Sequence, residues 1–234
     1  MRLEHDKAFW LSRNNLISLL SVEEFQEKIS IINITKSEKL ENFKVLDSLI
    51  LHNKNIIILE TESYNMYISL PFPFNINFKN LKEIIHFLES DKKIFLFFIE
   101  LGSWVIGKIK FKEILVSKRG ARYVKGRHKA GGQSQRRFER NREKWIEELY
   151  KKFVLDINDF FEKNNTLCDH YLALGEEKVL KDLFKFDFKN KHKFIKRKSS
   201  LKNYNSKTLV SASTNIWSSR VYIDTKNAIV KNHG

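Results

Sequence analysis

A long stretch of helical periodicity in the second half of the chain constrains the fold most strongly. Apolar side chains recur every three, four or seven residues over 138–164, which is typical of one face of a long amphipathic helix. Three β-rich runs precede it, at 93–100, 105–111 and 113–117, and they indicate neighbouring strands of one sheet. These segments together predict a mixed α/β fold, in which helices cover a sheet.

Shorter elements follow the long helix. Residues 170–174 are expected to form a strand and residues 176–184 a helix, a βα step that fits a sheet covered by helices. Two more runs, at 208–211 and 216–223, are expected to be closing strands.

The N-terminal part of the chain predicts a smaller α/β region. Ser21 and Glu24 have the spacing of a capping box, so a helix is expected to begin at about Val22. Residues 56–60 and 64–70 are expected to pair as a hairpin, and residues 78–89 have one apolar helix face. We therefore expect one region over residues 1–90, either separate or part of one continuous domain, and a second region over residues 91–234.

The charge of the chain favours a polyanionic partner. The 234 residues include 43 Lys and Arg against 28 Asp and Glu, a formal charge of +15, and 42% are hydrophobic, which is enough for a substantial core. Nucleic acid is the first candidate and an anionic membrane the second. The longest apolar run, 94–101, is too short to span a bilayer, and the acidic N-terminus argues against a targeting sequence. We expect a cytoplasmic protein without a membrane partner.

One segment between the strands and the long helix concentrates positive charge and glycine. Residues 118–144 contain eleven Lys or Arg and two Glu, and residues 118–134 hold four of the eight glycines. Arg136 and Arg137 would lie in the first helical turn, where the helix dipole disfavours cations, so an external anion is expected to compensate them. The pair Gly131-Gly132 would free the backbone of a loop tip from side-chain bulk, which lets it enter a narrow site.

The residues of this segment are those of a known family. The run Arg127-His-Lys-Ala-Gly-Gly-Gln-Ser-Gln-Arg-Arg-Phe-Glu-Arg-Asn-Arg-Glu143 resembles the loop–helix junction of eukaryotic and archaeal class I release factors. The preceding Ser117-Lys-Arg-Gly-Ala-Arg-Tyr-Val-Lys-Gly-Arg127 resembles the Vms-like release-factor family, including bacterial members that act in ribosome rescue and quality control. The resemblance implies an RNase H-like catalytic domain over residues 91–234, with a mixed sheet, flanking helices and a protruding Gly-Gly-Gln loop. Residues 1–90 would then dock on the ribosome or on another factor.

The resemblance also implies an activity. Water would attack the ester that joins a nascent peptide to tRNA, in the peptidyl transferase centre of the large ribosomal subunit. The chain has no recognisable decoding domain, so codon-independent action on stalled ribosomes is expected. The partners would be peptidyl-tRNA and ribosomal RNA, with no cofactor and no metal, and the protein would be monomeric off the ribosome. The catalytic residues would be Gly131, Gly132 and Gln133, and the RNA-binding residues would be Arg119, Arg122, Lys125, Arg127, His128, Lys129, Arg136, Arg137 and Arg140.

Two other functions stay open on the sequence alone: a nuclease that acts near the tRNA end, and a non-catalytic module that binds the ribosome or RNA. Other sites are disfavoured. Residues 102–108 imitate a phosphate loop, but Ile109 stands where a Ser or Thr would hold magnesium. Ser134 and His128 lack a third member of a hydrolase triad. The single cysteine, Cys168, excludes an internal disulfide and any multi-cysteine zinc site.

Overall fold

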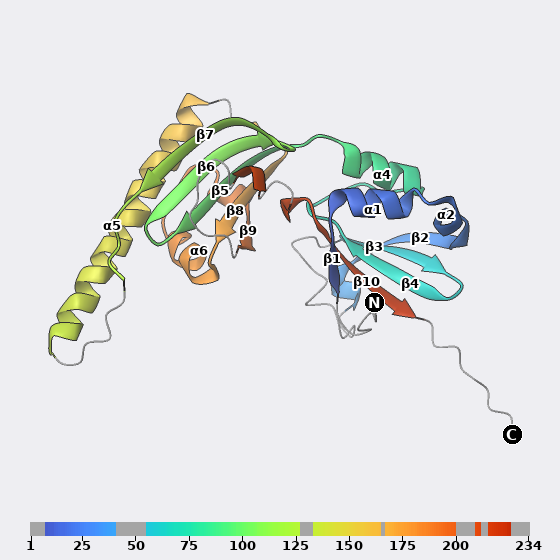
Figure 1. The fold of residues 1–234 in the computed structure, drawn as a ribbon, viewed down its shortest axis with the longest axis horizontal. Coiled ribbons are helices and arrows are strands. Elements are labelled where there is room, and N and C mark those ends of the chain that lie inside the picture. The colour runs from blue at the N-terminus through green and yellow to red at the C-terminus, as the bar shows by residue number, and fades with distance from the viewer. Residues whose placement is uncertain are drawn as a thin grey trace, which may run out of the picture. The chain divides into compact units, whose positions relative to one another are not determined.

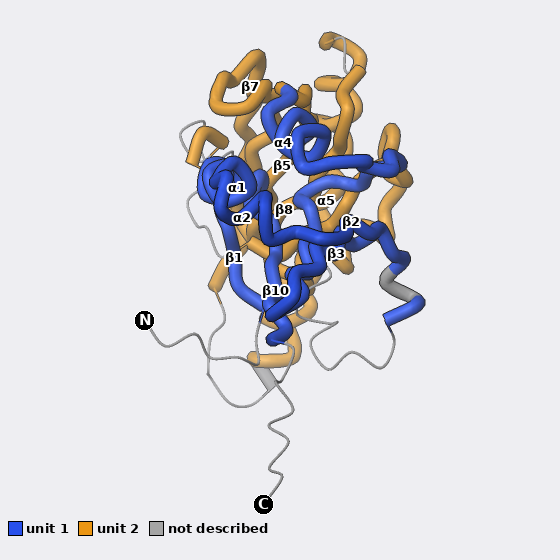
Figure 2. Tube along the Cα trace, turned by 90° about the vertical axis from the view of Figure 1, so that its right-hand side faces the viewer, with its two compact units in different colours: residues 1–90, 214–234 blue, residues 91–213 orange. Residues whose placement is uncertain are grey.

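The computed structural model describes two compact units of the chain (Figures 1 and 2). The first comprises residues 1–90 and 214–234, and the second comprises residues 91–213. Each unit contains one five-stranded sheet and its helices, so the predicted mixed α/β class is confirmed. Within these units the described residues are 8–40, 55–126, 133–164, 167–199, 209–211 and 215–225, with the side chains of 37, 38, 133 and 134 excepted.

In its described residues, the first unit is an antiparallel sheet on which helices α1, α2 and α4 pack. Its elements are β1 (Phe9–Leu11), α1 (Arg13–Leu20), α2 (Glu23–Lys28), β2 (Ile29–Lys36), η1 (Ser37–Leu40), β3 (Asn55–Thr61), β4 (Tyr64–Ser69), α4 (Leu81–Glu89) and β10 (Ser219–Thr225). The strand order is β1-β10-β4-β3-β2. Apolar side chains of the sheet and of the helices form one core, whose fully buried members include Leu16 of α1, Ile57, Ile68, Ile84 of α4 and Val221.

The predicted hairpin of the first unit is confirmed, and its predicted capping box is wrong. β3 and β4 pair antiparallel, and the hydroxyl of Thr61 donates to the carbonyl oxygen of Tyr64 at 2.8 Å in the turn. Ser21 does not begin α2, because it ends α1 and its hydroxyl donates to the carbonyl of Ile17 at 2.8 Å. α2 begins at Glu23, after Val22. Ser21 therefore caps the C-terminal end of α1 and does not cap the N-terminal end of α2.

The C-terminal strand corrects the predicted division at residues 91–234. β10 lies in the first sheet, between β1 and β4, and Val221 is opposite both Phe9 and Ile68. The side chain of Val221 is fully buried in that core. Residues 219–225 therefore belong to the N-terminal unit, because this apolar strand is buried in its core. In the sequence they are separated from residues 1–90 by residues 91–213, which form the second unit.

The second unit contains a mixed sheet. Its elements are β5 (Lys93–Glu100), β6 (Ser103–Lys110), β7 (Glu113–Ala121), α5 (Gln133–Lys163), β8 (His170–Gly175), α6 (Glu177–Leu183), η2 (Lys191–Lys193) and β9 (Phe194–Lys198). The strand order is β7-β6-β5-β8-β9. β7, β6 and β5 are antiparallel neighbours, whereas β8 and β9 run parallel to β5. The mixed sheet with flanking helices that was implied for this region is therefore confirmed.

One strand of this unit was not predicted, and one predicted strand is wrong. The strand that was not predicted is β9, which lies in a basic run of the sequence. The strand expected at 208–211 is absent, since residues 209–211 are helical. Leu209 is fully buried there, with its side chain against Gly107 of β6. Burial of one leucine, and not strand pairing, accounts for the apolar character of this run.

Helices α5 and α6 pack on the same face of the second sheet. Phe95 and Phe97 of the sheet, Phe153 of α5 and Leu180 of α6 belong to one buried cluster. α5 has 31 residues, so it is about 46 Å long. Its fully buried side chains begin at Leu149, and its N-terminal half extends beyond the strands (Figure 1).

Candidate nucleic-acid interface on helix α5

The end of β7 lies against the C-terminal half of α5. The ammonium group of Lys118 is 3.0 Å from a carboxylate oxygen of Asp156 and 2.9 Å from one of Asp159. Further along the strand, the ammonium of Lys152 donates to the carbonyl oxygen of Ala121 at 3.0 Å. These contacts hold the end of β7 against α5, just before residues 122–126 continue beyond the strand.

The backbone after β7 continues along α5 towards the helix N-terminus. Arg122 forms an ion pair with Glu148, and the guanidinium of Arg142 donates to the carbonyl oxygen of Lys125 at 3.2 Å. The ammonium of Lys125 lies 5.5 Å from the ring centre of Phe138. Later residues of the segment thus contact earlier residues of the helix. This antiparallel arrangement brings both flanks of residues 127–132 to the N-terminal end of α5.

The carboxylate of Asp156 connects this arrangement to the core. It accepts a hydrogen bond from the indole nitrogen of Trp104 at 3.1 Å as well as from Lys118. Burial lowers the pKa of Lys118, but hydrogen bonds to Asp159 and Asp156 outweigh it, so the pKa is raised. Hydrogen bonds from Lys163 and Lys118 lower the pKa of Asp159. Both Lys118 and Asp159 are therefore charged at neutral pH.

Several of the expected RNA-binding arginines are exposed. Arg136, Arg137 and Arg140 lie in the first turns of α5, and Arg119 lies near the end of β7. Within the described part of the chain, no carboxylate forms an ion pair with any of these four guanidinium groups. Cations at a helix N-terminus oppose the helix dipole, so an anion from outside the chain would stabilise them.

The remaining predicted site residues divide into three groups. Arg122 and Lys125 are exposed but also contact α5, as described above. Gln133 is the first residue of α5, and its side chain lies outside the described residues. Five further predicted residues lie outside them entirely: Arg127, His128, Lys129, Gly131 and Gly132. The catalytic and RNA-binding roles of all these residues stay predictions.

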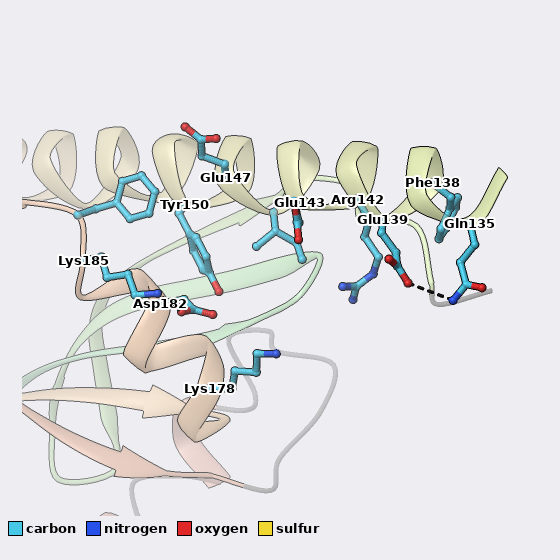
Figure 3. Close-up of a pocket in the computed structure, with 12 residues that line it drawn as sticks. Gln135, Phe138, Glu139, Arg142, Glu143, Glu147, Tyr150, Lys178, Asp182 and Lys185 are labelled. Atoms are coloured by element: carbon cyan, nitrogen blue, oxygen red, sulfur yellow. Dashed lines mark hydrogen bonds and ion pairs between the residues drawn. The ribbon is translucent and has the colours of Figure 1, made fainter. Parts of the chain in front are cut away.

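A groove of 830 Å³ lies between the N-terminal half of α5 and α6 (Figure 3). Its lining mixes charges of both signs, and one Glu139 carboxylate oxygen accepts a hydrogen bond from Gln135 at 3.1 Å. Burial, with the nearby charge of Asp182, raises the pKa of Tyr150 to about 12. Tyr150 is therefore a neutral phenol at pH 7, and the mixed lining suits a phosphate less well than the exposed arginines do.

Other candidate chemical groups have ordinary structural surroundings. Burial lowers the pKa of His170 to about 4 and raises the pKa of the Cys168 thiol to about 11, so both are uncharged at pH 7. The described residues contain no group of three or more His, Cys, Asp or Glu side chains placed to hold a metal ion. Among the helices described, none is both long and apolar enough to cross a bilayer.

A second basic surface lies at the β9 edge of the second sheet. The residues from Lys189 to Lys198 comprise η2 and the edge strand β9, and five of them are exposed lysines or histidines. The ammonium of Lys196 lies 4.7 Å from the ring centre of Phe184. The exposed cations of this edge are therefore accessible from solvent.

The comparisons with known proteins identify the family. Residues 92–222, more than half of the chain, match the family described as Actinobacteria/chloroflexi VLRF1 release factor. The chain belongs to this release-factor family. The resemblance to Vms-like release factors, which the sequence of residues 117–143 indicated, is thereby confirmed.

Individual relatives of this family member are distant. A segment of 65 residues is 38% identical to peptide chain release factor subunit 1 of Aeropyrum pernix, and it covers 28% of this chain and 17% of that protein. The structure of Archaeoglobus fulgidus Pelota is 9% identical, with a TM-score of 0.31, over 91% of this chain and 62% of that one. The archaeal translation termination factor aRF1 is 11% identical, with a TM-score of 0.33, over 92% of this chain and 74% of that one.

The sequence did not reveal the residues that hold the basic segment in place. Trp104, Arg142, Glu148 and Asp156 do this through the contacts described above. One signal was available, because Glu148, Lys152 and Asp156 recur every four residues beside the apolar face of α5. That pattern is also common on solvated helices, so it did not identify a partner strand.

Proposed function

We propose that this chain releases nascent peptides from ribosomes by hydrolysing the ester bond of peptidyl-tRNA. Membership of a release-factor family and the intact Gly131-Gly132-Gln133 sequence support the proposal. In it, Gly131 and Gly132 shape the loop, and Gln133 orients the attacking water. The release acts on stalled ribosomes, independently of a stop codon, as the resemblance to the Vms-like family implies.

The antiparallel contact between residues 118–125 and α5 is the observation on which the proposal depends. It brings the flanks of residues 127–132 to the free end of a helix whose positions 135–148 include no buried side chain. These positions span about 20 Å at the usual helical rise. A tip supported in this way has the reach to enter a narrow site on a large partner.

Exposed charge on β7 and on the first turns of α5 supports an RNA partner. The four exposed arginines Arg119, Arg136, Arg137 and Arg140 form no ion pair within the described residues. Arginine holds phosphate oxygens through its planar fork, which lysine lacks. RNA phosphates would therefore compensate both these charges and the helix dipole.

The proposed reaction needs little activation from the chain. The oxygen of water bonds to the ester carbonyl carbon, the bond from that carbon to the ribose oxygen breaks, and a proton passes to the ribose oxygen. The proposal assigns catalysis to positioning of the water and to polar contacts with the developing oxyanion, from Gln133 and loop amides. It assigns the remainder of the site to the ribosome.

A release assay tests the proposal against its alternatives. Stalled ribosome–nascent-chain complexes are incubated with wild-type protein and with Gln133→Ala, and peptide and tRNA are followed on one gel. The proposal predicts free peptide and intact tRNA for the wild type, and no release for the variant. Shortened tRNA would instead support a nuclease, and ribosome binding without any release would support a non-catalytic module.

A further inference from the structure

Tyr123 is an exposed aromatic residue within the basic segment, and 74% of its surface is accessible. It has no part in the catalysis proposed above. The residues around it are held in place: the amide of Arg122 donates to the carbonyl of Gly102 at 3.0 Å, and Val124 packs against the core. The carbonyl of Lys125 accepts from Arg142. A fixed backbone thus presents a solvent-exposed ring.

Side chains alternate along this segment. Lys118 and Arg122 face α5, as their contacts with Asp156 and Glu148 show. A Cβ on Gly120 would point to the ring of Trp104, which itself bonds to Asp156 of α5. Residues between them point the other way, because successive side chains of an extended backbone lie on opposite faces. Arg119 and Tyr123 therefore share the face away from α5.

The chemistry of that face fits RNA. Arg119 supplies a cation on this face, and residues 118–126 contain no acidic residue. Arg119 lies four residues, or about 13 Å, from Tyr123 in an extended strand. A cation and an exposed ring on one face can bind single-stranded nucleic acid, since the ring stacks on a base and the cation meets a phosphate elsewhere along the strand. A protein partner would gain less from a face with this one-sided charge.

We propose that the outer face of residues 119–125 binds unpaired RNA, with the ring of Tyr123 stacked on a base and Arg119 on a phosphate. The inference deepens the proposed function, because it rests on a ribosomal or tRNA partner and assigns that partner a second contact beside the loop. It does not depend on ester hydrolysis. The two can therefore fail separately.

Binding of labelled RNA tests the inference. Fluorescence anisotropy is measured with a six-nucleotide single-stranded RNA and with a twelve-base-pair RNA duplex. Tyr123→Ala should weaken binding of the single strand by roughly five- to 150-fold, because a stacked base contributes about that factor. Tyr123→Phe should bind as the wild type does. Leu155→Ala, which removes another exposed apolar side chain at 69% exposure, is the matched control and should have no effect.

The dependence on salt separates stacking from charge. Tyr123→Ala should leave the slope of log affinity against log salt unchanged, whereas Arg119→Gln should reduce its magnitude by about 0.7 for one lost phosphate contact. Unchanged affinity of Tyr123→Ala, or a loss in Tyr123→Phe equal to that in Tyr123→Ala, would overturn the inference. Weaker ribosome binding with unchanged RNA affinity would also overturn it, in favour of a protein contact.

Two further samples identify the source of the RNA. A deficit of Tyr123→Ala on isolated deacylated tRNA assigns the base to tRNA, whereas a deficit on vacant ribosomes assigns it to ribosomal RNA. Either result supports the inference. Peptide release by Gln133→Ala, measured separately, tests the proposed function and not this contact.

Discussion

Gly120 of β7 lies directly against the indole ring of Trp104. A Cβ atom placed on Gly120 would approach the ring atom Cε2 of Trp104 to 2.2 Å, far inside van der Waals contact. The ring is fully buried, and its nitrogen is bonded to Asp156. The absence of a side chain at position 120 therefore allows the basic segment to lie close to the core and to α5.

Gly120→Ala should destabilise the protein by about 3 kcal/mol, because the buried ring of Trp104 has no free space into which to move. Urea unfolding measures the change. Gly126→Ala is the control, since a Cβ there would meet nothing within 4 Å. Equal stability of Gly120→Ala and the wild type would show that Trp104 does not fix the segment.

Exchanging the charges of Arg122 and Glu148 should separate positioning from RNA binding. Arg122→Glu alone should slow peptide release, because it opposes Glu148 and displaces the segment from α5. The double variant Arg122→Glu with Glu148→Arg should recover most of the release rate. If the double variant is as slow as Arg122→Glu, Arg122 acts on RNA and not through Glu148.

Arg140→Gln should weaken RNA binding and reduce the magnitude of the salt slope by about 0.7. The reason is its exposed guanidinium on the N-terminal half of α5, which pairs with no carboxylate of the described residues. Lys151→Gln removes the same charge from the same helix, but Lys151 already pairs with Glu147 at 2.6 Å. Filter binding at several salt concentrations compares them. Equal losses would indicate a response to net charge alone.

The stability of the protein should fall between pH 7 and pH 5 through His170. Burial lowers its folded pKa to about 4 from 6.5, so the unfolded chain takes up a proton first as the pH falls. The free energy of unfolding therefore falls as the pH drops from 6.5 towards 4. At pH 5 it should be about 2 kcal/mol lower than above pH 6.5. His170→Gln should remove this part of the decrease in urea unfolding. An unchanged pH profile in His170→Gln would contradict the assignment.

The sequence predicted those elements whose periodicity is long or regular. The apolar face from Phe138 to Phe160 predicted α5, and the alternation in residues 105–111 predicted β6. Patterns of this kind reflect burial of one face, which is a local property of the chain.

Features that depend on distant partners could not be predicted. The strand expected at 216–223 is found as β10, but it joins the first sheet because Val221 meets Phe9 and Ile68, and no local pattern indicates that pairing. The sequence of β9 is rich in lysine and has little apolar pattern, because an edge strand tolerates charged side chains. The same limit applies to the site. The motif residues were evident, but Glu148 and Trp104 became evident only once the segment was seen to lie along α5.

The most direct test is the rate of peptide release at saturating protein by wild type, Gln133→Ala and Gln135→Ala. Gln135 is the matched control, two residues further along α5, where its side chain bonds to Glu139. The proposed hydrolase predicts a fall of about 100-fold or more for Gln133→Ala, with intact tRNA and unchanged ribosome binding, and a near-normal rate for Gln135→Ala. Equal release by Gln133→Ala and the wild type would contradict the central claim.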